Sequence, residues 1–433
     1  MTAAKHLRGI PVASQVPPRA TLGRWSFFRG WTFAVVTMAL IVAADFAWRV
    51  RPQDASLSGS IDLSVVIELM IYGVVGALLV LRLIDLPRGP QPSVLMTALW
   101  LYVFAMGLSV VLSPYRLLAT TRAGQLVVVA LLATVVARSA RRLDIHRFLH
   151  LYVAVAVVVV PLGLALQFPA SVRAEQGRFR WLYVHPVIAA NFLGIALVIA
   201  VSYLLLTRGS DRIFLWRRWA YWAAAIVIAG ALLSTETRGA ILAAGAACVV
   251  AAVVSRPSRW VDTLVIGIAG VTAALILSSE QLLSFLLRGE GVAQLETLNS
   301  RTDVWAQASE LVGQAPWLGH GFMAARGLFL DQFGLGGAHN AVFEVLVNAG
   351  IVGFLAWLAM LVATVVSSIR FARQRSARSR ADAPIVCGLL TFLFVNAVTT
   401  GQIAQAANAQ SVILFVVIGW LAARPRWMTG AKR

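Results

Sequence analysis

The chain of 433 residues is short of charged residues, cysteine and carboxylates. Charged residues make up 13% of it and hydrophobic residues 59%, whereas a soluble domain carries about 25% charged residues. This shortage excludes a soluble globular protein. The two cysteines, Cys248 and Cys387, lie inside apolar runs, so we expect neither a disulfide framework nor a zinc site built on cysteine spacing.

Several motifs of energy-coupled and metal-dependent proteins are also missing. The sequence has no Walker A motif, which excludes ATP as the direct driving force. Its 18 Asp and Glu residues include no Asp-x-Asp pair and no outward cluster with metal-ligand spacing. We therefore expect neither a metal nor a cofactor. No internal repeat is visible, which disfavours an inverted-repeat transporter.

The chain does have a series of apolar runs, each close to the ~20 residues that a membrane-spanning helix needs. We therefore predict an all-α polytopic membrane protein with about 12 transmembrane helices. Tryptophans at the ends of runs, such as Trp31, Trp181 and Trp260, fit the aromatic belts of membrane interfaces. The expected spans lie near residues 31–50, 61–82, 93–113, 117–137, 148–168, 185–207, 219–235, 239–255, 260–278, 341–369, 384–400 and 409–423.

The net charge of +19 fits a membrane protein better than a nucleic-acid-binding one. Most of the 37 Lys and Arg residues fall in both tails and in alternate connections, as the positive-inside rule requires of cytoplasmic segments. We expect no nucleic-acid partner, and we expect both termini in the cytoplasm. The expected organisation is a tail at 1–30, nine spans within 31–278, an outward loop at 279–340, three spans within 341–423 and a tail at 424–433.

The outward loop between the ninth and tenth spans is expected to be partly helical. Ser300-Arg301-Thr302-Asp303 has the features of a helix start, and an apolar face at helical spacing follows it. Gly313 and Pro316 should end this helix. The glycine-rich remainder is expected to be loop, and a long structured loop of this kind is usually functional.

Outward-facing arginines break the positive-inside pattern. They suit an anionic ligand held in the bilayer, such as a lipid diphosphate, because Arg binds phosphate through paired, charge-assisted hydrogen bonds. For any one of them, a snorkelling side chain or a local ion pair, such as Arg238 with Glu236, is the alternative. The outward arginines are Arg173, Arg178, Arg180, Arg238, Arg301 and Arg326.

Three histidines also face outward in this scheme. His339 stands where the glycine-rich loop becomes an apolar helix, and the positive end of the helix dipole disfavours imidazolium there. A neutral imidazole can take a proton from a sugar hydroxyl, although a plain polar cap is the alternative. His185 precedes Pro186 at a span start and is either a cap or a substrate contact, and His320 lies between two glycines.

These pieces, taken in order, resemble the O-antigen ligase and polymerase superfamily of bacterial membrane glycosyltransferases. The resemblance covers residues 170–360 in motif and the whole chain in topology. Val187 and Thr235-Glu236 depart from the family pattern, which often has Asn and a Ser-rich stretch at these points. The matching segments are Arg180 to Pro186, Ser234 to Ala240, Ser300 to Trp305, Pro316 to Gly321, and His339-Asn340 with Gly350 and Gly353.

The resemblance implies a GT-C-like fold in the bacterial inner membrane, with a periplasmic active site. The implied reaction is a metal-independent, inverting transfer of polysaccharide from undecaprenyl diphosphate to the lipid A-core oligosaccharide. His339 would be the general base, with Arg238 and Arg301 on the diphosphate. The residues implied to contact substrate are Arg178, Arg180, His185, Arg326 and Asn340.

Other functions remain open from the sequence. A polymerase of O-antigen or exopolysaccharide would use the same donor with a growing glycan as acceptor. A protein O-glycosylating oligosaccharyltransferase is a more distant alternative, because those chains are usually longer. A transporter of lipid-linked sugars would carry out no chemistry. Besides membrane lipids and these substrates, no protein partner is expected.

Overall fold

The computed structural model describes residues 30–48, 55, 57, 60–86, 93–166, 177–206, 215–262, 301–374, 376–404 and 408–428. Within these ranges the regular structure is entirely helical. The α-helices are α1 (Trp31–Asp45), α2 (Leu63–Asp85), α3 (Val94–Ser109), α4 (Arg116–Ser139), α5 (Arg142–Ala165), α6 (Pro186–Leu206), α7 (Leu215–Ser234), α8 (Arg238–Ser255), α12 (Arg301–Gln314), α13 (Ala324–Phe333), α14 (Ala341–Ala372), α15 (Ala377–Ala397) and α16 (Ala409–Met428). Short 3-10 helices are η3 (Val110–Leu112), η6 (Pro257–Arg259) and η7 (Gln402–Ala404).

Length and composition confirm the prediction of an all-α polytopic membrane protein. Among the described residues, eight helices are long and apolar enough to cross a membrane, and α1 and parts of α7 and α16 form three shorter apolar helices. The expected span at 260–278 lies largely outside the described residues, so the total of about 12 stays a prediction. The helices α5 and α15 begin before their expected spans, because hydropathy marks only the apolar part of each helix.

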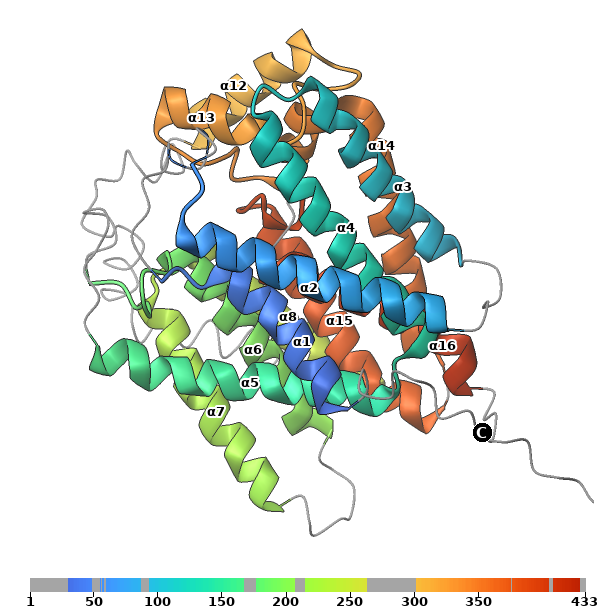
Figure 1. Ribbon diagram of the computed structural model, residues 1–433. Helices are drawn as coiled ribbons and strands as arrows, with labels where there is room; N and C mark the ends of the chain where they lie inside the picture. Colours follow the sequence, from blue (N-terminus) through green and yellow to red (C-terminus); the bar gives the residue numbers. More distant parts are fainter. Residues whose placement is uncertain are drawn as a thin grey trace, which may run out of the picture.

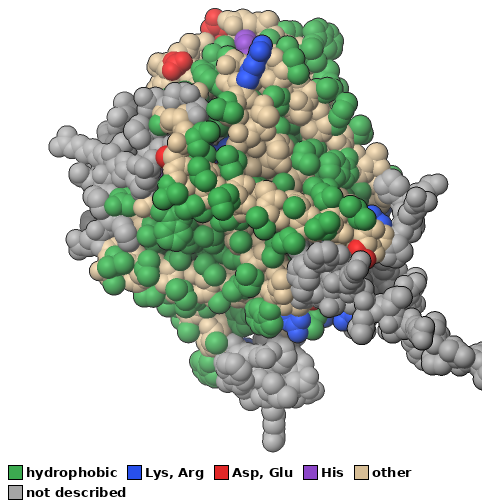
Figure 2. Space-filling model, viewed as in Figure 1, with side chains coloured by type: hydrophobic (Ala, Val, Ile, Leu, Met, Phe, Trp, Pro, Cys, Tyr) green, Lys and Arg blue, Asp and Glu red, His purple; other side chains and the backbone are tan. Residues whose placement is uncertain are grey.

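The spans pack into one bundle around α6, α15 and α16. The helix α15 runs along α8 and α6, α16 runs along α4, and α14 runs along α3 (Figure 1). Small residues permit this packing, since a Cβ at Gly194 of α6 would lie 2.4 Å from the ring of Phe392 of α15. The helix α2 lies at the edge with most of its surface exposed. Figure 2 shows hydrophobic side chains over the middle of the visible face, as a lipid-facing surface requires.

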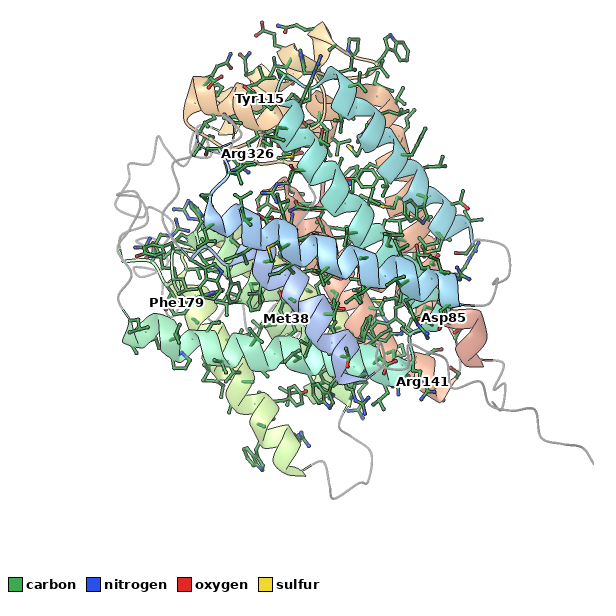
Figure 3. The ribbon with its side chains drawn as sticks, viewed as in Figure 1. Met38, Asp85, Tyr115, Arg141, Phe179 and Arg326 are labelled. Atoms are coloured by element: carbon green, nitrogen blue, oxygen red, sulfur yellow. The ribbon has the colours of Figure 1, made fainter. Side chains whose placement is uncertain are left out.

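One end of the bundle is covered by α12 and α13, which lie across the starts of α4 and α14 (Figure 1). We call this the α12 end. The opposite end is held by polar side chains: Arg142 Nε of α5 donates to Asp382 Oδ2 of α15 at 2.6 Å, and His146 Nε2 lies 3.2 Å from Asp382 Oδ1. Figure 3 places Asp85 and Arg141 at that opposite end, away from Tyr115 and Arg326.

The span expected at 341–369 corresponds to α14, which is broken at Gly350. This residue has φ 60° and ψ −163°, a backbone conformation open to glycine alone. The segment 316–321 fills the break: Ile351 N–H donates to the Pro316 carbonyl at 2.8 Å, and His320 N–H donates to the Val347 carbonyl at 2.8 Å. Backbone groups that the helix leaves unpaired inside the bundle are thereby satisfied.

The helix predicted at the start of the outward loop is confirmed as α12, whereas the prediction of loop for the glycine-rich remainder is wrong for residues 324–333. Residues 324–333 form α13, with Gly327 inside it. Glycine is tolerated there because the ring of Tyr115 occupies the place of a side chain; a Cβ on Gly327 would lie 2.1 Å from the Tyr115 hydroxyl. Residues 279–300 lie outside the described residues.

Candidate functional site

The start of α14 holds His339 in a strained backbone conformation. His339 has φ 51°, in the left-handed region that costs a non-glycine residue about 1–2 kcal/mol. Asn340 is the N-cap of the helix, and its Oδ1 accepts from Val342 N–H at 2.9 Å and Phe343 N–H at 3.3 Å. His339 is half-buried. The imidazole therefore belongs to a fixed backbone at the positive end of a helix dipole.

The helix α12 fixes the segment that precedes His339. Trp305 Nε1 donates to the carbonyl of Ala338 at 3.2 Å, and the Trp305 ring stacks on Phe343 with 6.2 Å between centroids. Arg301 is the first residue of α12, one helical turn before Trp305. Docking of α12 thus places Arg301 one helical turn from the contact of Trp305 with the residues around His339.

The turn that follows α15 joins the starts of two helices. Asn340 Nδ2 donates to the carbonyl of Val398 at 3.2 Å. The next residue, Thr399, contacts Gly239 so closely that a Cβ there would lie 2.2 Å from Thr399 Oγ1. Gly239 directly follows Arg238, the first residue of α8. The helix starts that carry His339 and Arg238 therefore meet on consecutive residues of one turn.

Arg178 supports the connection between α7 and α8. Its Nε donates to the Thr235 carbonyl at 2.8 Å, and its terminal NH2 donates to Thr237 Oγ1 at 3.0 Å. Between these two threonines, Glu236 has φ 53°, a second strained backbone at this end. Arg178 thereby holds the turn from which Arg238 begins α8, and these hydrogen bonds give it a positioning role beside its predicted contact with substrate.

Arg180, His185 and His320 make contacts of other kinds. Arg180 is buried, and its carbonyl lies so close to Gly163 of α5 that a Cβ there would be 2.6 Å away. His185 is exposed, and its Nδ1 accepts from Val187 N–H at 3.1 Å, so it caps the start of α6 as the sequence allows. His320 Nε2 is bonded to the Leu311 carbonyl at 2.8 Å, which gives it a structural role.

Arg326 lies on α13 at the same end of the molecule, near Tyr115 (Figure 3). It is half-buried and precedes Gly327, against which the Tyr115 ring packs. Burial, and secondarily the charge of Asp331, raise the pKa of Tyr115 above its ordinary value, so the hydroxyl stays neutral. The structure thus places Arg326 at the contact between α13 and the start of α4.

Two features of this end depend on contacts that the sequence does not show. A chain of side-chain amides links three elements: the buried Asn396 Nδ2 donates to the buried Asn191 Oδ1 at 2.8 Å, and Asn191 Nδ2 donates to Oε1 of the half-buried Gln402 at 2.8 Å. Glu344, recognisable from sequence only as an acid in a span, is fully buried one turn into α14. Its signal is the acid inside an apolar run, which marks a functional candidate without showing its partner.

Fold and site together define a polytopic α-helical membrane protein that gathers strained loops, helix starts and arginines at one end. Residues 223–358 match the family model described as O-antigen ligase. A 135-residue stretch is 27% identical to an O-antigen ligase of Pseudomonas aeruginosa, covering 31% of this chain and 31% of that relative. Residues 223–358 are therefore similar to the O-antigen ligase family, in agreement with the resemblance predicted from the motifs.

The matched region contains only part of the candidate site. It includes the starts of α8, α12 and α14, and so Arg238, Arg301, Arg326, His339 and Asn340. It leaves out Arg178, Arg180 and His185, which precede it. The turn after α15, on which the site is assembled, also lies outside it.

Proposed function

We propose that the chain is a ligase that moves O-antigen polysaccharide from undecaprenyl diphosphate to the lipid A-core oligosaccharide. The family match over residues 223–358 supports the coarser statement that the protein is a ligase- or polymerase-type glycosyltransferase for lipid-linked O-antigen. The observation that carries the finer proposal is the meeting of the His339 and Arg238 helix starts on the turn after α15.

The proposed chemistry is a direct displacement at the anomeric carbon. The imidazole of His339 removes the proton from the acceptor hydroxyl while its oxygen attacks that carbon. The bond from the anomeric carbon to the diphosphate oxygen breaks, the lipid diphosphate leaves with the bonding electrons, and the configuration inverts. One glycosidic bond forms for each glycosyl–phosphate bond broken.

The charge on the leaving diphosphate is countered by fixed groups of the protein. Arg238 and Arg301 supply charge-assisted hydrogen bonds. The starts of α8 and α14 meet at the same turn, and each adds about half a positive charge from its helix dipole. This cationic surface is the basis for proposing a metal-independent transfer.

We assign the α12 end to the periplasm. The candidate-site arginines at the α12 end are outnumbered by arginines at the opposite end, such as Arg138, Arg142 and Arg370, as the positive-inside rule requires of a cytoplasmic face. A lipid diphosphate presented in the outer leaflet would then meet Arg238 at the level of its headgroup. In this orientation the protein is a multi-pass protein of the inner membrane with its termini in the cytoplasm.

The test is complementation of a deletion strain, read as lipopolysaccharide on a gel. Wild-type protein should restore long polymer on the core. His339→Ala should leave bare core, since a general base contributes about 10²- to 10⁴-fold to rate. Gln332→Ala, an exposed residue of the same region, is the matched control and should behave as wild type.

The gel also separates the alternatives. A core capped with a single repeat unit in the deletion strain would identify a polymerase and overturn the ligase proposal. Normal lipopolysaccharide in that strain would point to an exopolysaccharide enzyme or to a transporter. Full activity of His339→Ala, at a protein level equal to wild type, would refute the assignment of the base.

A further inference from the structure

Glu344 is a carboxylic acid buried in the first turns of α14, close to the candidate base. Its side chain has no exposed surface. Burying a carboxylate costs several kcal/mol unless hydrogen bonds or charges compensate for the lost water. Its place near the start of a helix is favourable for negative charge. A residue kept here despite that cost has a specific local task.

Its contacts show what that task is. Glu344 Oε2 accepts from Ala338 N–H at 2.9 Å, so the helix reaches back to hold the residue before His339. Two glycines make room for the carboxylate: a Cβ on Gly337 would lie 2.9 Å from Oε2, and a Cβ on Gly401 would lie 3.2 Å from it. The carboxylate is therefore enclosed by the loop before α14 and the segment after α15.

The peptide groups around Ala338 are held from both directions. Glu344 accepts from the Ala338 N–H, and Trp305 of α12 donates to the Ala338 carbonyl at 3.2 Å. On the other side of His339, Asn340 is bonded to Val398. A residue with φ near 50° keeps that conformation only when its neighbours determine it. The fixed residues on either side of His339 meet this requirement.

We propose that Glu344 is a positioning residue that holds the His339 backbone in its left-handed conformation and so aims the imidazole at the α8 start. It acts through the Ala338 N–H and needs no contact with substrate. This inference rests on the proposed role of His339 as general base. Trp305 and Asn340 also help to fix the backbone around His339. Glu344 differs from them in linking the loop before α14 to the body of α14 itself.

The test compares three variants of purified protein in a transfer assay with lipid-linked glycan and core acceptor. Glu344→Gln keeps an acceptor oxygen for Ala338 N–H and should retain kcat within about threefold of wild type. Glu344→Ala removes the acceptor and should lower kcat at least tenfold, with the KM for the donor within about twofold. Glu310→Ala, an exposed acid on α12, is the control and should leave both constants unchanged.

A purely structural role for Glu344 predicts a different pattern. If Glu344 serves stability alone, Glu344→Ala should give less folded protein on a size-exclusion column, while kcat per folded molecule equals that of wild type. That result would overturn the inference. Failure of Gln to rescue relative to Ala would also overturn it. The proposed function fails separately, since it requires His339→Ala to be inactive, whatever the result at position 344.

Discussion

Gly239→Ala should uncouple the two halves of the candidate site. The new Cβ would lie 2.2 Å from Thr399 Oγ1 and 2.9 Å from Thr399 Cβ. Contact normally begins near 3.4 Å, so the α8 start and the turn after α15 must separate by about 1 Å. Thr399 cannot simply rotate away without losing its hydrogen bond to the Asn396 carbonyl, which measures 3.1 Å.

The expected magnitudes follow from that displacement. Overpacking of this kind typically costs about 1–3 kcal/mol of stability. A shift of about 1 Å between reacting groups can cost about 100-fold in rate. Since Asn340 is bonded to Val398, the neighbour of Thr399, the shift moves Arg238 relative to His339. We therefore expect kcat/KM to fall about 100-fold, more than the stability change explains.

The control lies on the same helix. A Cβ on Gly245 meets no atom within 4 Å, so Gly245→Ala should keep full activity and raise stability by about 0.5–1 kcal/mol through helix propensity. A double variant with Thr399→Ala removes the Oγ1 contact and should recover part of the activity lost in Gly239→Ala. The measurements are transfer rate and thermal unfolding in the same detergent. Equal rates for the two glycine variants would refute a site assembled on this turn.

Three further predictions concern the cap, the helix break and the metal. Asn340→Asp keeps the N-cap acceptor for Val342 N–H but loses the N–H that donates to the Val398 carbonyl. It should therefore keep the stability of about 1 kcal/mol that Asn340→Ala loses with the cap. Activity should fall in both variants, because both lose the hydrogen bond to Val398. Gly350→Ala places a Cβ 2.4 Å from the Trp317 backbone and should lower the melting temperature sharply, whereas Gly107→Ala, with open space around it, should not. Treatment of purified protein with EDTA should leave transfer intact; a loss restored by magnesium or manganese would contradict the proposed role of the arginines.

Sequence reasoning located the spans that the described residues cover, because each depends on local hydropathy alone. It also located α12, whose start and apolar face lie within a few residues of each other. It missed α13 because the tolerance of Gly327 depends on Tyr115, more than two hundred residues earlier. The break in α14 could not be predicted either. The N–H groups of Ile351 and Val352 after the break donate to the carbonyls of Pro316 and Trp317, and no local sequence pattern identifies these partners.

The candidate site shows the same division. His339 and Arg238 stand out in the sequence because the expected topology places both on the outward side, where the positive-inside rule predicts few cations, and each lies at the start of an apolar helix. Both helix starts are supported by Val398 and Thr399, which have no distinctive sequence signal. Val398 accepts a hydrogen bond from Asn340 through its backbone carbonyl, and Thr399 packs closely against Gly239. Long-range partners of this kind cannot be derived from composition or periodicity. The catalytic roles themselves stay predictions until the variants are measured.

The break at Gly350 sets the height of His339 above the lipid. Beyond the break, α14 runs to Ala372, which at 1.5 Å per residue gives about 33 Å, enough to cross the ~30 Å hydrocarbon core alone. Exposed apolar side chains follow at once, starting with Val352 and Leu355. The segment before the break adds up to about 14 Å more, which exceeds the headgroup layer of about 5–8 Å on each side. The first turns of α14 would thus hold the His339 imidazole outside the hydrocarbon core, at the boundary with water. The proposed acceptor sugar, which is hydrophilic, could reach it there without entering the bilayer.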